Sequence, residues 1–217
     1  MTEQKLMPGW AHGIGKFLAH GVWNTRVLGA ELVPETGPVV LAANHVSVID
    51  GPLLAGASPR RLNILVKEEM FHGPIGAILR ASGQIPVDRD GGGRSALVAG
   101  LNVLQRGGAV GVFPEGNRGR GDAASARAGV SWLAVNGDAP VVPVAVLGTR
   151  RTGEGVNHIP GVRRRLWVRF GEPIMPVREP GASKREAVSA TNEAVRVALS
   201  GLVARTLSEV GVGLPED

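Results

Sequence analysis

The architecture of this chain is clearest in one stretch, which reads Pro38-Val39-Val40-Leu41-Ala42-Ala43-Asn44-His45-Val46-Ser47-Val48-Ile49-Asp50. Its first half is a short apolar run that follows a turn at residues 34–37, and this pattern predicts a buried strand. Ser47 and Asp50 then have the spacing of a helix capping box, so we expect a helix to begin at about Val48. The stretch therefore predicts a strand that ends at His45 and passes directly into a helix.

Strand-like and helix-like segments alternate along the rest of the chain. Predicted strands lie at residues 27–32, 39–43, 62–66, 84–87, 109–113, 141–146 and 166–170, and predicted helices at 48–57, 74–81, 94–106, 123–136 and 183–209. The alternation predicts an α/β fold, a single-domain layered structure with a mixed, largely parallel sheet flanked by helices. We place this domain at residues 26–217, preceded by an N-terminal amphipathic helix within residues 1–25.

The spacing of His45 and Asp50 suggests chemistry. Asp50 falls in the first turn of the predicted helix, so its carboxylate turns back toward the imidazole of His45. Such a carboxylate accepts a hydrogen bond from one ring nitrogen and leaves the other nitrogen free to act as a base. The plainer interpretation is a loop histidine beside a helix-capping aspartate, and the spacing alone does not choose between the two.

Two more charged segments follow predicted strands. One reads Phe113-Pro114-Glu115-Gly116-Asn117-Arg118, a glycine-rich loop whose backbone N–H groups and guanidinium suit an anionic group. The other, at residues 83–90, contains Arg89. Each is also compatible with an ordinary turn that bears solvated charges. We expect Arg89 to bind a phosphate at the edge of the sheet where His45 and Glu115 emerge.

These segments occur in the order of the four motif blocks of the glycerolipid acyltransferases. The matching blocks are residues 44–50, 83–89, 113–118 and 141–144, and the resemblance spans roughly residues 27–205. The chain most resembles the 1-acyl-glycerol-3-phosphate acyltransferases. Asn117 departs from the pattern, since the family usually has Thr there, but Asn also donates and accepts hydrogen bonds.

The resemblance implies roles for the matching residues. His45 matches the catalytic base, and Asp50 matches the aspartate that orients it and stabilises its charge. The residues that match those associated with binding the glycerol phosphate of the acceptor are Arg89, Glu115, Gly116, Asn117 and Arg118.

The implied reaction transfers a fatty acyl group from acyl-CoA or acyl carrier protein to the free hydroxyl of 1-acyl-glycerol-3-phosphate, with no cofactor and no metal. The chain has no cysteine and no Gly-x-Ser-x-Gly sequence, which favours direct attack by the hydroxyl over an acyl-enzyme. Acylation of glycerol-3-phosphate, another lysophospholipid or a glycolipid is the nearest alternative. A non-catalytic lipid-binding protein is an alternative from a different class.

The amino-acid composition limits which classes of molecule this protein can bind. The net charge is +5, and the basic excess is rich in arginine, which suits anionic lipid headgroups and phosphorylated substrates as well as a solvated basic face. The chain has no tyrosine and four phenylalanines, so it lacks the stacking surface expected of a nucleic-acid-binding protein. The absence of cysteine excludes disulfides and is compatible with a reducing cytoplasm. No apolar run approaches the ~20 residues of a membrane-spanning helix.

The N-terminal segment is the expected membrane contact. Its apolar side chains fall on one face at helical spacing, namely Trp10, Ile14, Phe17, Leu18 and Val22. Such a helix can lie in the membrane interface, or it can dock on the domain's own core. We expect a peripheral or monotopic enzyme at the cytoplasmic face of the cell membrane, where it meets lysophosphatidic acid, the acyl thioester and anionic lipids.

Overall fold

The computed structural model describes residues 4–88, 93–116, 121–123, 128–177 and 180–216. The strands are β1 (Asn24–Leu28), β2 (Val39–Ala43), β3 (Leu62–Lys67), β4 (Ile85–Val87), β5 (Ala109–Val112), β6 (Val141–Leu147) and β7 (Arg165–Phe170). The α-helices are α1 (Gly9–Lys16), α2 (Asp50–Ala57), α3 (Gly73–Ala81), α4 (Arg94–Gln105), α5 (Gly129–Gly137) and α6 (Lys184–Val210). Shorter elements are the π-helix η1 (Phe17–Val22) and the 3-10 helices η2 (Ala30–Leu32) and η3 (Glu68–Phe71).

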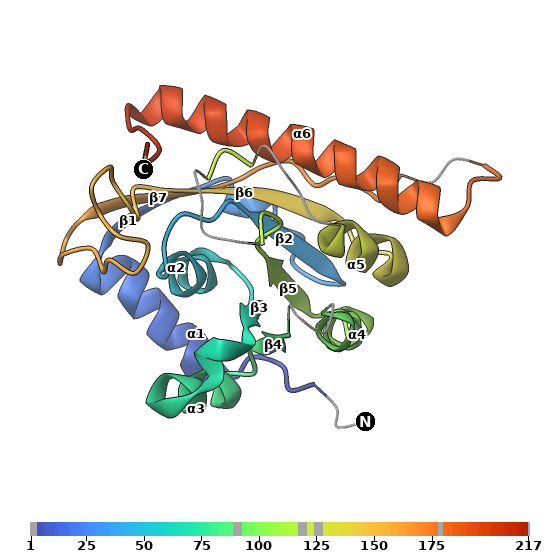
Figure 1. Ribbon diagram of the computed structural model, residues 1–217, viewed down its shortest axis with the longest axis horizontal. Helices are drawn as coiled ribbons and strands as arrows, with labels where there is room; N and C mark the ends of the chain where they lie inside the picture. The colour runs from blue at the N-terminus through green and yellow to red at the C-terminus, as the bar shows by residue number, and fades with distance from the viewer. Residues whose placement is uncertain (1–3, 89–92, 117–120, 124–127, 178–179, 217) are drawn as a thin grey trace.

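The strands form one sheet in the order β1-β7-β6-β2-β5-β3-β4 (Figure 1). All neighbouring pairs are parallel except β6 and β7, which are antiparallel. The predicted α/β fold with a mixed, largely parallel sheet is therefore confirmed. Because β2, β3, β4 and β5 run the same way, their carboxyl ends meet at one edge of the sheet, which is where ligands bind in open α/β sheets.

Strand β2 lies near the middle of the sheet and is buried on both faces. Val39, Leu41 and Ala43 pack in a cluster with residues of α1 and α2, while Val40 and Ala42 pack on the other face in a cluster with residues of α4 and α5. Figure 1 shows α1 and α2 on one side of the sheet and α6 along the other. A strand covered on both faces needs a continuous apolar run, as the sequence has here.

The N-terminal segment docks on α2 through small residues. Ala11, Gly15 and Ala19 are buried, and a Cβ atom built on Gly56 of α2 would lie only 2.0 Å from the carbonyl oxygen of Gly15. The two backbones approach this closely because neither position has a side chain. The segment is thus part of the folded domain.

The larger side chains of this segment divide into two sets. Trp10, Ile14 and Phe17 are 50%, 53% and 66% exposed, whereas Leu18 and Val22 are partly buried against the core. The prediction that all five form one surface is therefore wrong. At the helical spacing of about 100° per residue, Leu18 and Val22 lie nearer to the buried Ala11 and Gly15 than to Trp10 and Ile14, so they face the core. In the part of the chain that the structure describes, no helix is both long and apolar enough to span a bilayer.

Several predicted boundaries are wrong. The strand that was predicted to end at His45 ends at Ala43, and two more differences lie outside the site. The first strand ends at Leu28 rather than at residue 32, because Gly29 adopts φ +71° where its backbone passes Phe170, and η2 follows. The helix predicted from residue 123 begins at Gly129, and Ala123 has φ +54°, which is not helical.

Candidate active site

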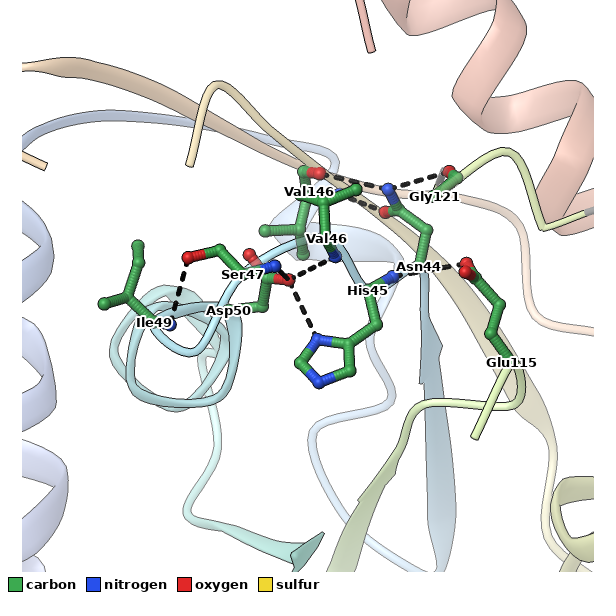
Figure 2. A network of polar contacts seen from close by, with 9 residues as sticks. All are labelled: Asn44, His45, Val46, Ser47, Ile49, Asp50, Glu115, Gly121 and Val146. Atoms are coloured by element: carbon green, nitrogen blue, oxygen red, sulfur yellow. Dashed lines mark hydrogen bonds and ion pairs between the residues drawn. The ribbon is translucent and has the colours of Figure 1, made fainter. Parts of the chain in front are cut away.

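The side chains of His45 and Asp50 are in direct contact just beyond the end of β2. The distance from His45 Nδ1 to Asp50 Oδ2 is 2.9 Å (Figure 2). A carboxylate can only accept, so the ring nitrogen that faces it is the protonated one. The other nitrogen, Nε2, lies on the side of the ring away from Asp50 and is available to a substrate. The predicted contact is present.

Asp50 is held in place by the backbone as well as by the imidazole. Its Oδ2 also accepts hydrogen bonds from the N–H groups of Val46 at 2.7 Å and Ser47 at 2.8 Å. The side chain is fully buried and begins α2, where the helix dipole favours a negative charge. Three donors therefore converge on one oxygen, and together they fix the position of the carboxylate relative to the ring.

The helix begins later than we predicted. Asp50 is its first residue and Ile49 its N-cap, so residue 48 is not helical. The capping box is only half formed, since Asp50 accepts from the Ser47 N–H but Ser47 Oγ accepts from Ile49 N at 3.4 Å. The physical reason is that Asp50 also binds Val46 and His45, which keeps the chain between them in a tight turn.

Phe113 sets the plane of the imidazole. Its ring stacks on the ring of His45 with centroids 4.2 Å apart and planes 21° from parallel. Phe113 follows the last residue of β5, which pairs with β2 so that Val112 lies opposite Ala42. The stacking therefore follows from strand register, and it leaves the His45 side chain 13% exposed.

Glu115 lies on the backbone side of His45. Its Oε1 accepts a hydrogen bond from the His45 backbone N–H at 3.2 Å, and its carboxylate also receives a hydrogen bond from the Ala123 backbone. Burial raises the pKa of Glu115 to about 7, and repulsion from Asp122 and Asp50 adds to the rise while the two hydrogen bonds oppose it. The Glu115 side chain thus connects the turn after β5 to the segment that contains His45 and Asp50.

Asn44 makes a second connection, which we did not predict. Its side chain is fully buried; Nδ2 donates to the carbonyl oxygens of Gly121 at 3.1 Å and Val146 at 3.2 Å, and Oδ1 accepts from Val146 N at 2.7 Å. Figure 2 shows these bonds joining the end of β2 to β6 and to Gly121. The available signal was a polar residue next to a buried strand, since a buried amide must find partners.

A large apolar cavity opens beside His45. Its volume is about 900 Å³, and its wall includes residues from several elements, among them Trp10, Ile14, Pro52, Ile64, Ile78 and Leu97. The wall also includes His45, Gly116 and Lys67. Lys67 forms an ion pair with Glu69 at 2.8 Å. Lys67 is a second residue that we did not predict, although its place at the end of a strand on the same sheet edge was a usable signal. The cavity suits a long apolar ligand whose reactive end lies at the histidine.

The predicted anion-binding residues are only partly described. Glu115 and Gly116 lie at the same sheet edge as His45, and Gly116 adopts φ +72°. Arg89, Asn117 and Arg118 lie outside the described residues. Their predicted roles therefore stay predictions.

An α/β sheet with a His–Asp pair at its carboxyl edge, beside an apolar cavity, has the features of an enzyme that binds an apolar ligand next to a base. A family model described as Acyltransferase matches residues 24–147, more than half of the chain. The chain belongs to this family, and it is an acyltransferase enzyme. The predicted relationship to the glycerolipid acyltransferases is confirmed.

Individual relatives agree with this family. The chain is 28% identical over 172 residues to the 1-acyl-sn-glycerol-3-phosphate acyltransferase of Bacillus subtilis (strain 168). The aligned region covers 78% of this chain and 83% of that protein. The chain is 31% identical over 115 residues to the Homo sapiens 1-acyl-sn-glycerol-3-phosphate acyltransferase beta, covering 51% of this chain and 41% of that protein. The crystal structure of the 1-acyl-sn-glycerophosphate (LPA) acyltransferase PlsC from Thermotoga maritima shares the fold, with a TM-score of 0.66, 24% identity, and coverage of 89% of this chain and 78% of that one.

Proposed function

We propose that this enzyme transfers a fatty acyl group from an acyl thioester to the free hydroxyl of 1-acyl-glycerol-3-phosphate, which gives phosphatidic acid. The observation that supports this most is the His45–Asp50 pair. One ring nitrogen of His45 is free, and His45 is part of the wall of the apolar cavity. The names of the relatives supply the acceptor. A non-catalytic lipid-binding protein would have no need of an oriented base at this place.

The proposed step uses His45 as a general base. Nε2 removes the proton from the acceptor hydroxyl as its oxygen attacks the thioester carbonyl, and a tetrahedral intermediate forms. The intermediate collapses with cleavage of the C–S bond, and the imidazolium returns the proton to the leaving thiolate. Asp50 stabilises the imidazolium and keeps the ring oriented through both transfers. No acyl-enzyme and no cofactor are needed.

The substrates divide between the apolar and polar parts of the site. We place the acyl chain in the 900 Å³ cavity, because burial of its methylene groups contributes about 0.8 kcal/mol each. We place the acceptor phosphate at the loop that begins at Gly116, with Arg89, Asn117 and Arg118 as its partners on the basis of the family resemblance. Guanidinium groups bind phosphate oxygens in pairs, which suits this role.

We propose that the enzyme works as a peripheral protein on the cytoplasmic face of the membrane. Trp10, Ile14 and Phe17 are exposed on the N-terminal segment, and Ile75 and Ile78 are each 58% exposed on α3. Four of these five side chains, all except Phe17, also belong to the wall of the cavity. An apolar rim around an apolar cavity favours entry of substrate directly from the lipid phase.

An acceptor screen tests the reaction. Purified protein receives labelled acyl-CoA with 1-acyl-glycerol-3-phosphate, glycerol-3-phosphate, other lysophospholipids or no acceptor, beside a folded His45→Ala variant. We expect labelled phosphatidic acid from the first acceptor, and about a hundredth as much or less from the variant in the same time. Preferred acylation of another acceptor would replace the proposed substrate. No transfer to any of these acceptors, from acyl-CoA or from acyl carrier protein, would contradict the proposed reaction.

A further inference from the structure

The connection between β6 and β7, residues 148–164, exposes an apolar tip. Ile159 is 68% exposed and Val162 is 74% exposed, which makes them two of the most exposed large apolar residues in the described part of the chain. Arg163 and Arg165 beside them are also exposed. Aliphatic side chains flanked by arginines match the interface of an anionic bilayer, where apolar groups enter the acyl boundary and guanidinium groups meet phosphates.

The loop is held in shape by its own ion pairs. Both carboxylate oxygens of Glu154 bind Arg164, at 2.7 and 2.9 Å, and Glu154 also accepts from the backbone N–H of Arg151 at 2.8 Å. The hydrogen bonds from Arg164 are the main reason that the pKa of Glu154 is lowered to about 2. A tip supported in this way keeps its apolar residues outward without losing further chain entropy when it meets a partner.

Three hydrogen bonds fasten the loop to functional parts of the enzyme. Trp23 Nε1 donates to the Pro160 carbonyl at 3.1 Å, and Arg163 N donates to the Val22 carbonyl at 2.7 Å, so the tip lies against the end of η1. Val48 N, in the turn between His45 and Asp50, donates to the Val156 carbonyl at 3.0 Å. Figure 1 shows the loop at the far end of the N-terminal helical segment from α3.

The same loop belongs to the cavity. Val156 and Ile159 are part of its wall, together with Trp10 and Ile14 of α1 and with residues of α3. Each of the three segments therefore contributes exposed apolar side chains to the wall of one cavity. The tip continues the apolar rim of the N-terminal segment on the side where the catalytic turn is attached.

We propose that Ile159 and Val162 insert into the surface of an anionic membrane and form a second membrane contact beside the N-terminal segment. The inference rests on the proposed function, since it adds a contact to a membrane-bound enzyme. The loop lies at the far end of the N-terminal segment from the exposed Ile75 and Ile78 of α3, so a contact there fixes the rotation of the protein on the bilayer and holds the cavity mouth toward the lipid.

Vesicle binding of a double variant tests the contact. Ile159→Ser with Val162→Ser should weaken binding to phosphatidylglycerol/phosphatidylcholine vesicles by about tenfold or more. The matched control is Met175→Ser with Val197→Ser, at two residues that are 61% and 53% exposed. Val197 lies on α6, which covers the face of the sheet opposite to α1 and α2. Met175 follows the bridge between Ile174 and Val141, the first residue of β6, at the end of the sheet opposite to His45. The control should bind as the wild type does, and both variants should keep its melting temperature.

A site-specific label gives a second measurement that does not depend on the serine variants. The chain has no cysteine, so Val162→Cys and Val197→Cys can each carry a single environment-sensitive dye such as NBD. We expect a blue shift on adding anionic vesicles at position 162 and none at 197. Unchanged vesicle binding of the Ile159/Val162 variant with no shift at 162 would overturn the inference. If the same protein still bound vesicles through its N-terminal residues and made phosphatidic acid, the proposed function would stand without it.

Discussion

The turn from His45 to Asp50 and the rim of the cavity differ in how firmly the fold holds their side chains. At the turn, Asp50 Oδ2 receives three hydrogen bonds, one of them from the His45 ring, and Asn44 makes three, so hydrogen bonds hold the turn on both sides of His45. At the rim, Trp10 and Ile159 belong to the cavity wall and are 50% and 68% exposed, so folding leaves half or more of each uncovered. The difference teaches that acyl transfer needs preorganised polar groups, whereas membrane binding needs apolar surface that folding leaves uncovered.

Removal of the base should have the largest effect. His45→Ala should lower kcat by about 10²–10⁴-fold, the usual contribution of a general base. The fold should persist, because Asp50 keeps its two backbone donors. Steady-state kinetics beside circular dichroism checks this. Near-normal turnover in folded protein would remove His45 from the mechanism and make the turn a structural feature only.

Asp50→Asn separates charge from shape in the same turn. The side-chain oxygen of asparagine can take the place of Oδ2 and accept the same three hydrogen bonds. Its NH₂ group then takes the place of Oδ1, an atom that has no hydrogen-bond partner in the described part of the chain. We expect kcat to fall about 10²-fold or more, because the imidazolium loses its counter-charge. The measurement is kcat as a function of pH, with the melting temperature as the control. Wild-type kcat would show that Asp50 only caps the helix.

Polar substitutions on the N-terminal rim should act on membrane binding alone. Trp10→Ser with Phe17→Ser should weaken binding to anionic vesicles by about 10- to 100-fold, since two large side chains leave the interface. Leu18 is unsuitable for this test because it packs against the core. Vesicle co-sedimentation and a melting curve are measured together. A large loss of melting temperature with unchanged binding would assign this face to the core.

Glycine substitutions test how the rim is joined to the domain. Gly56→Ala should destabilise the protein by about 1–3 kcal/mol, because the added methyl would meet the Gly15 backbone and push α1 away from α2. The control is Gly13→Ala in α1, the helix that packs against α2, where nothing lies within 4 Å of the added methyl. It should be neutral or stabilising, since alanine favours the helix. Equal effects of the two changes in urea unfolding would contradict the close packing.

The smallest expected effect is a pH dependence at Glu115. Its pKa of about 7 means that the folded protein binds this proton more tightly than the unfolded chain, so its contribution to stability falls as pH rises from 4.5 to 7. Glu115→Gln cannot ionise, so its free energy of unfolding should rise by about 1–2 kcal/mol relative to wild type between pH 4.5 and 7. This is less than a fully buried carboxyl would give.

Urea unfolding at several pH values measures this change. Glu35→Gln removes one exposed carboxyl and reports the effect of net charge alone. A constant difference between wild type and Glu115→Gln at every pH would show that the Glu115 carboxyl does not hold its proton.

Local patterns were enough to predict the strands of the sheet, most of the helices and the contact between His45 and Asp50. Strand β2 is a continuous apolar run, and the His–Asp contact spans five positions, so both depend on residues close in the sequence. Local patterns predicted the wrong end for the strand at Gly29 and the wrong start for the helix at Ala123. The first position is decided by the approach of Phe170, and the second lies in a corner that packs against α6.

Only the tertiary structure decided which distant residues meet. Nothing local pairs β1 with β7, joins Asn44 to Val146, or places Gly15 on Gly56. The same holds for Leu18 and Phe17, neighbours in one helical segment, of which one is partly buried and the other exposed. Propensity and capping act over a few residues and can be read from the chain, whereas burial depends on which surface folds against a residue from elsewhere.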